Sequence, residues 1–178
     1  MKIRETKLHG AYELSLDFSE DERGDFVKTL HTGSFSEYGL DSEFKESYFS
    51  TSKAGVVRGM HFQVPPHDHS KLVYAVDGAV LDVLLDIRKD SETYGQYDTI
   101  ELSKSRRNAV YIPKGIAHGF CVKEGAGTLV YLTTTVYNKD SDTGVLWNSF
   151  GFNWPIDTPL ISERDRSFKP MDQFSSPF

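Results

Sequence analysis

Three histidines, an arginine and a lysine gather in one short stretch, RGMHFQVPPHDHSKLV, which covers residues 58–73. Imidazole exchanges protons readily near neutral pH. A guanidinium suits phosphate, and an ammonium can hold a developing oxyanion. Gln63 follows His61 by two residues, so the two would share one face of a strand. Arg58, His61 and Lys71 together therefore suit proton transfer on an anionic substrate.

The same histidines also allow a metal-binding interpretation. His67 and His69 form an H-x-H pair, and His118 follows in IPKGIAHGF, so three imidazoles could meet on one divalent ion. Small β-barrels of the cupin class bind metal with such histidines and a glutamate. Lys71, and not an acid, stands seven residues before Gly78, where that glutamate is expected, and its ammonium would repel the ion. We favour acid–base chemistry without a metal and place His67 and His69 in a loop or at the rim of the site.

Length and composition restrict the class of protein. A chain of 178 residues with 38% hydrophobic and 13% aromatic residues is typical of a single globular domain, here residues 1–178. The net charge of -6 argues against nucleic acid or an anionic membrane as a partner. The lone Cys121 is expected to be a small buried hydrophobe. Without a signal-like or membrane-spanning apolar run, the expected location is the cytoplasm.

Short apolar or alternating runs between turn residues predict an all-β protein, either a two-sheet sandwich or a small barrel. KLVYAVDGAVLDVLLDI (71–87) reads as two strands around a tight Asp77-Gly78 hairpin. NAVYIPKGIAHGF (108–120) reads as strand, Pro-Gly turn and strand. TLVYLTTTVY (128–137) is strand-like and would point Tyr131 and Tyr137 the same way. Short helices are expected in 34–40 and 159–166, and the last twelve residues as a surface tail or an arm on a neighbour.

Several ordered motifs at near-family spacing carry a resemblance over nearly the whole chain. They are ERGDF (22–26), GVVRGMHFQ (55–63), SKLVYAVDGAVLDVLLDIRKDSETYG (70–95), IPKGIAHGF (112–120), VYLTTTVYNKDSDTGVLWN (130–148) and WPIDTPLISERD (154–165). The chain resembles the dTDP-4-dehydrorhamnose 3,5-epimerase family of nucleotide-sugar epimerases. The resemblance implies an all-β fold of the cupin type, a jelly-roll or double-stranded β-helix barrel with a few short helices.

The resemblance also implies residue roles. His61 is similar to the catalytic base, Asp165 to its partner, Tyr131 to the proton donor, and Lys71 to the residue near the sugar C4 oxygen. The implied substrate-binding set is Arg23, Lys28, Glu46, Tyr48, Arg58, Gln63, His118, Tyr137, Asp142 and Arg164. The family implies a homodimer in which an N-terminal strand crosses to the partner, so Arg23 would act in the neighbouring site.

Elementary carbonyl chemistry agrees with these roles. Removing a proton beside a ketone places charge on the carbonyl oxygen, and a nearby cation such as Lys71 lowers the cost of that enolate. Inverting a carbon needs a base on one face and an acid on the other, here His61 and Tyr131. Neither a metal nor a redox cofactor is then required. The expected substrate is a nucleotide-linked 4-keto-6-deoxyhexose of deoxysugar or surface polysaccharide biosynthesis.

Three positions depart from the family pattern. Lys28 replaces an acid, Glu46-Ser47-Tyr48 replaces a Gln-x-Asn pattern, and His69 replaces a glutamine. Glu46 could accept from an exocyclic amine and Lys28 could donate to a ring carbonyl, which would suit a CDP- or GDP-linked sugar beside a dTDP-linked one. Epimerisation at one carbon only, a 3,4-ketoisomerase, and a non-catalytic or metal-dependent cupin are the further alternatives.

Overall fold

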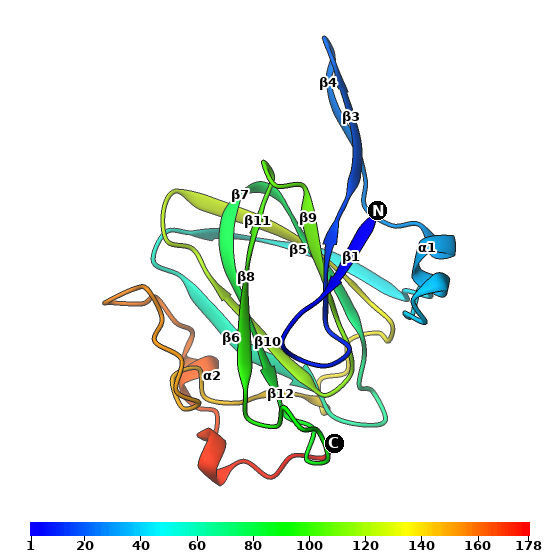
Figure 1. Cartoon of the computed structure of the whole chain (residues 1–178). Helices are drawn as coiled ribbons and strands as arrows, with labels where there is room; N and C mark the ends of the chain where they lie inside the picture. Colours follow the sequence, from blue (N-terminus) through cyan, green and yellow to red (C-terminus); the bar gives the residue numbers. More distant parts are fainter.

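Long antiparallel strands dominate the chain, because β-branched and aromatic residues recur in runs separated by glycine and proline. The computed structural model describes residues 1–178 (Figure 1). Its strands are β1 (Lys2–Glu5), β2 (Tyr12–Ser15), β3 (Asp17–Asp21), β4 (Gly24–Lys28), β5 (Glu46–Lys53), β6 (Val57–Gln63), β7 (Lys71–Asp86), β8 (Tyr97–Ser103), β9 (Asn108–Ile112), β10 (Ile116–Cys121), β11 (Ala126–Thr133) and β12 (Asp142–Gly144). Its helices are α1 (Thr32–Glu37), α2 (Glu163–Arg166) and a 3-10 turn at Met171–Gln173.

Two antiparallel sheets face each other and share one strand. The first has the order β1-β2-β9-β7-β11-β5, and the second runs β8-β7-β10-β6-β12. The β7 strand pairs with β9 and β11 along its first half and with β8 and β10 along its second half. The predicted all-β jelly-roll barrel of the cupin type is confirmed.

The predicted hairpin at Asp77-Gly78 is wrong, since β7 continues without interruption through this dipeptide. Gly78 does adopt a positive φ of 63°. That backbone conformation serves a bulge, because Thr128 pairs with Asp77 while Leu129 pairs with Ala75, and Val76 has no partner on β11. The bulge turns the strand from one sheet into the other. The Asp77-Gly78 dipeptide therefore forms a bend within one strand and not a hairpin turn. The pairing of β7 with its neighbouring strands decides between these two structures.

Replacing Gly78 with alanine is expected to lower the free energy of unfolding by about 3 kcal/mol or more, because left-handed strain and a steric clash add. A Cβ atom at this position would lie 1.8 Å from the Ala126 carbonyl oxygen. Gly125 is the matched control: its φ is +64°, but a Cβ atom there would meet nothing within 4 Å, so Gly125→Ala should cost only about 1 kcal/mol. Urea denaturation of both variants checks this. Equal losses would contradict the clash.

Side-chain alternation along the strands puts apolar residues on both faces of the shared strand. Val73 and Leu84 belong to the cluster between the sheets, whereas Val83 and Leu85 pack in a cluster on the outer side, under the C-terminal segment. The inward face also carries polar residues that the alternation places in the barrel, Lys71 and Asp82 among them. A barrel interior with polar side chains on a continuous apolar wall is the usual construction of a ligand pocket.

Other sequence-based expectations have mixed outcomes. The Pro-Gly turn lies between β9 and β10 as predicted, and α1 and α2 fall in or next to the two expected helical segments. Cys121 is buried, which raises the pKa of its thiol to about 11 and fits a hydrophobic role. The C-terminal residues are not a free tail, because Phe174 and Phe178 pack edge-on against Phe62 of the same chain. The chain contains no helix long and apolar enough to cross a bilayer.

The β3–β4 hairpin projects away from the barrel (Figure 1) and forms a separate two-stranded sheet. Arg107, in the turn after β8, contacts both of its strands: the guanidinium lies 4.2 Å from the centre of the Phe18 ring and pairs with Glu20 and Asp25, which lie near the turn of the hairpin. Phe26, in the middle of β4, is 67% exposed. The hairpin is thus held in an extended position with an apolar ring facing outward.

Candidate active site

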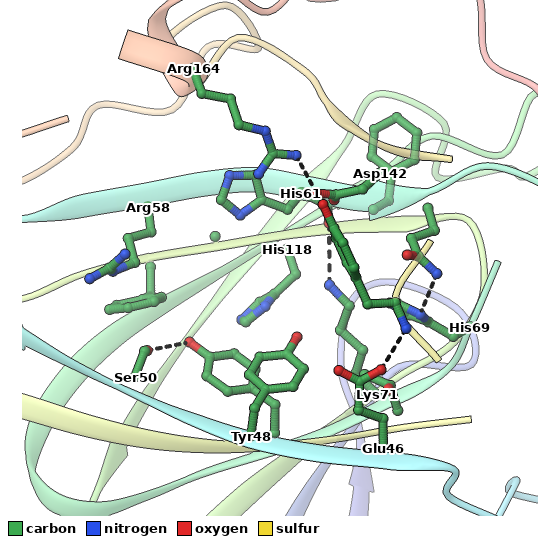
Figure 2. Close-up of a pocket in the computed structure, with 17 residues that line it drawn as sticks. Glu46, Tyr48, Ser50, Arg58, His61, His69, Lys71, His118, Asp142 and Arg164 are labelled. Carbon is green, nitrogen blue, oxygen red and sulfur yellow. Dashed lines mark hydrogen bonds and ion pairs between the residues drawn. The ribbon is translucent and has the colours of Figure 1, made fainter. Parts of the chain in front are cut away.

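One pocket of about 350 Å³ opens between the two sheets (Figure 2). Most predicted site residues line it: His61, Tyr131, Lys71, Glu46, Tyr48, Arg58, Gln63, His118, Tyr137, Asp142 and Arg164. Asp165 does not line the pocket but is hydrogen-bonded to His61, which does. Arg23 and Lys28 lie outside the pocket, on the projecting hairpin. The lining also includes His69 and residues that the sequence did not single out, namely Ser50, Phe62, Gly119, Phe120 and Thr133.

His61 and Asp165 form a hydrogen-bonded pair on one wall. Met60 and Phe62 of β6 face outward into an apolar cluster, so His61 between them faces the pocket. Its Nε2 lies 2.8 Å from Oδ1 of Asp165, whose Oδ2 accepts from the Gly59 amide. Burial raises the pKa of Asp165, but the hydrogen bonds from His61 and Gly59 outweigh it and hold the pKa below its usual value. An ionised carboxylate only accepts, so Nε2 carries the proton and Nδ1 keeps a free lone pair.

Two parallel phenol rings form the facing wall, on the other sheet. Tyr131 of β11 and Tyr48 of β5 are direct cross-strand partners, and their rings stack with centroids 4.8 Å apart and planes 16° apart. The Tyr131 hydroxyl lies 3.1 Å from Ser50 Oγ. Burial raises the pKa of Tyr131 well above its usual value. The phenol is therefore fully protonated at neutral pH.

Lys71 begins β7 and points into the barrel between these two walls. The side chain is nearly fully buried, and its Nζ donates to the His61 carbonyl oxygen at 3.4 Å. Burial lowers its pKa to about 8, although Asp142 and Asp82 act in the opposite direction. An ammonium with few fixed acceptors around it is well suited to stabilise a new negative charge on a ligand.

A second histidine–carboxylate pair lies deeper in the barrel. His118 is the cross-strand partner of His61, and its Nε2 lies 2.7 Å from Oδ1 of Asp82. Burial lowers the pKa of His118 and raises that of Asp82, and Oδ2 of Asp82 has no hydrogen-bond partner. Sequence reasoning missed Asp82. The available signal was an acid on an inward position of the strand, between Val80 and Leu84.

Cationic and aromatic groups surround the mouth of the pocket. Arg58 donates to Ser52 Oγ at 2.9 Å and forms no ion pair, so its remaining N–H groups are available to an anion. Arg164 pairs with Asp142 at 2.7 Å (Figure 2). Tyr137 is 59% exposed, which leaves a ring face open to a planar ligand.

Two of the predicted binding side chains already have internal partners. Glu46 accepts a hydrogen bond from the Tyr137 amide. Gln63 accepts from the Asn138 amide at 2.7 Å and donates to the His67 carbonyl at 2.7 Å. Both therefore organise the loop after β11 while they line the pocket.

His69 lies in the loop between β6 and β7, as expected, and its side chain lines the pocket. Its Nδ1 lies near Thr135 Oγ1 and the Gln63 amide, and its Nε2 is buried without a partner. Burial, followed by the charges of Lys71 and Lys114, lowers its pKa to about 3, so the ring is neutral. His67 instead bonds Ser141 Oγ at 2.9 Å, outside the pocket. No group of three or more His, Cys, Asp or Glu side chains has the arrangement of metal ligands.

Comparisons with known proteins agree over most of the chain. A family model described as dTDP-4-dehydrorhamnose 3,5-epimerase matches residues 5–173. The chain is 40% identical over 148 residues to the dTDP-4-dehydrorhamnose 3,5-epimerase of Shigella flexneri, covering 82% of each chain. It is 37% identical to the dTDP-4-dehydrorhamnose 3-epimerase of Streptomyces niveus, covering 93% of this chain and 82% of that protein.

A solved structure is similar in fold as well. It is the dTDP-6-deoxy-D-glucose-3,5-epimerase of Legionella pneumophila in complex with dTDP-4-keto-L-rhamnose. The two chains superpose with a TM-score of 0.92 and 30% identity, covering 98% of this chain and 94% of that one.

Proposed function

The chain belongs to the dTDP-4-dehydrorhamnose 3,5-epimerase family, and from that premise we propose that it epimerises a dTDP-linked 4-keto-6-deoxyhexose by proton transfer beside the C4 ketone. The observation that carries the proposal is the placement of His61 and Tyr131 on facing sheets of one pocket, with Lys71 between them. The sugar ring would lie between the imidazole and the phenol.

Each group has a step that its environment supports. Nδ1 of His61 takes the proton from the carbon beside the ketone, and the C–H electron pair forms an enolate on the C4 oxygen. The Lys71 ammonium stabilises that oxygen, and Asp165 stabilises the imidazolium. The enolate carbon then takes a proton from the Tyr131 hydroxyl on the opposite face. Solvent returns a proton to the phenolate and removes the one on His61, so the step is balanced.

The nucleotide part would occupy the mouth of the pocket. Arg58 has N–H groups free for the diphosphate, and the exposed ring of Tyr137 suits stacking on a base. Glu46 and Lys28 are the residues that would favour a base with an exocyclic amine. Within one chain neither is placed to contact such a base, because Glu46 accepts from the Tyr137 amide and Lys28 lies on the projecting hairpin. Thymidine is also the nucleoside named for the relatives.

The number of carbons that react is the finer part of the proposal. Relatives of similar identity include both a 3,5-epimerase and a 3-epimerase. We assign both carbons to this protein. Solvent deuterium uptake from D2O into dTDP-4-keto-6-deoxyglucose, followed by NMR at each carbon, tests the reaction. Uptake at C3 and C5 is the expected result; uptake at one carbon would limit the enzyme to a monoepimerase, and none at all would refute the function.

A homodimer would complete the site. Arg23 lies in the turn of the projecting hairpin, outside the pocket of its own chain, and Arg107 holds that hairpin through Glu20 and Asp25. We therefore place Arg23 in the pocket of a second copy. Mixing Arg23→Ala and His61→Asn chains should restore about a quarter of the wild-type sites, because half of the randomly mixed dimers contain one intact pocket.

The two variants assayed separately, at the same total concentration, are the control for that mixture. Each must be nearly inactive alone, and analytical ultracentrifugation must show that both still dimerise. A mixture no more active than the sum of the separate variants would place Arg23 outside the partner's pocket.

A further inference from the structure

Tyr48 is a pocket side chain to which the mechanism above gives no step. It lies beside Tyr131 on the wall that faces His61, and its hydroxyl takes part in none of the hydrogen bonds of the chain (Figure 2). The Tyr131 hydroxyl, in contrast, is near Ser50. The wall therefore presents two separate phenols to any ring bound opposite His61.

The reaction proposed above requires two protons on the same face of the sugar. The reacting carbons flank the ketone carbon on either side, and each gives a proton to the base and receives one from the opposite face. A single buried phenol must be reprotonated between the two inversions. Two parallel rings with centroids 4.8 Å apart would offer one hydroxyl to each carbon.

We propose that Tyr48 is a second proton donor, which protonates one of the two carbons while Tyr131 protonates the other. This inference rests on the proposed epimerase function. In the Tyr48 step the O–H bond breaks, the proton forms the new C–H bond of the enolate carbon, and the resulting phenolate takes a proton from water.

The surroundings of Tyr48 suit this role. Burial, with help from the charges of Glu46 and Asp142, raises its pKa to about 12, so the hydroxyl carries its proton at neutral pH. The side chain is nevertheless 43% exposed, compared with 6% for Tyr131. Water can therefore reach Tyr48 directly, whereas the proton of Tyr131 is better supplied through its hydroxyl neighbour Ser50.

The test compares Tyr48→Phe with Tyr131→Phe, each of which removes a hydroxyl and keeps the stacked ring. Turnover of dTDP-4-keto-6-deoxyglucose in D2O is followed by NMR, which reports exchange and inversion separately at C3 and C5. Each variant should lose inversion at one carbon by at least about tenfold. The carbon lost in one variant should be the carbon kept in the other, and exchange through His61 should persist at both.

Tyr94→Phe is the matched control, because Tyr94 is a partly exposed tyrosine outside the pocket. Inversion at both carbons by Tyr48→Phe, within twofold of wild type, would overturn the second donor while leaving the epimerase function in place. Loss of the same carbon in both variants would also overturn it. A wild-type protein that exchanges only one carbon, or none, would refute the second donor together with the relevant part of the proposed function.

Discussion

His61→Asn is expected to lower proton exchange at the reacting carbons by about three orders of magnitude, because it removes the base that we propose for every inversion. The imidazole faces the pocket and its Nε2 is held by Asp165, so that only Nδ1 can accept a proton. Asparagine keeps a polar side chain of similar reach but cannot be protonated. The rate of deuterium uptake from D2O measures the loss without requiring that epimerised product accumulates.

His9→Asn provides the comparison, since His9 is an exposed histidine outside this pocket. Asp165→Asn should give an intermediate loss of about 100-fold, because the imidazolium loses its anionic partner while the base remains. If His61→Asn retained more than a tenth of the wild-type exchange rate, another group would have to remove the proton.

Lys71→Met is expected to lower kcat/KM by about 100- to 1,000-fold, because the enolate oxygen loses its cation. The pH dependence is the more diagnostic result. Burial lowers the Lys71 pKa to about 8, and only the protonated form stabilises an oxyanion, so wild-type activity should fall as the pH rises through about 8. In Lys71→Met the low remaining activity should show no such fall.

Stability should change with pH in the opposite direction. Between pH 8 and 10.5 the unfolded chain keeps its Lys71 proton while the folded chain releases it, so the unfolded state binds more protons. The free energy of unfolding therefore rises with pH across this window as far as Lys71 contributes. Urea titrations of wild type and Lys71→Met at pH 7.5 and 9.5 isolate that contribution.

The activity prediction has its own contradicting outcome. A wild-type activity that stays constant to pH 10 would show that the Lys71 ammonium is not required.

Much of the site could be predicted from the sequence because its residues lie in ordered motifs with fixed spacing. His61, Lys71, His118 and Tyr131 each occupy an inward position of a strand that β-propensity and alternation identify. The family resemblance indicated which distant residues come together. Side-chain periodicity alone shows which residues share one face of a strand, but not which other strand pairs with it. Asp165 illustrates this limit, because it reaches His61 from a helix 104 positions later in the chain.

The incorrect predictions have a common physical origin in tertiary structure. Asp77-Gly78 has the sequence of a hairpin turn, but pairing with β9, β10 and β11 keeps β7 extended on both sides of it. Asp82 was missed because alternation along a strand does not show which of its faces the other sheet covers.

The strand shared by the two sheets has a consequence for how the spacing of the catalytic groups can be retuned. β11, which carries Tyr131, pairs mainly with the part of β7 before the bulge at Val76 to Gly78, and β6, which carries His61, is joined through β10 to the part of β7 after it. The angle of that bend sets the gap between the imidazole and the phenols. A substitution at the bend can thus widen or narrow the gap without altering any side chain that lines the pocket, and under the proposed function it would shift selectivity between neighbouring sugar carbons.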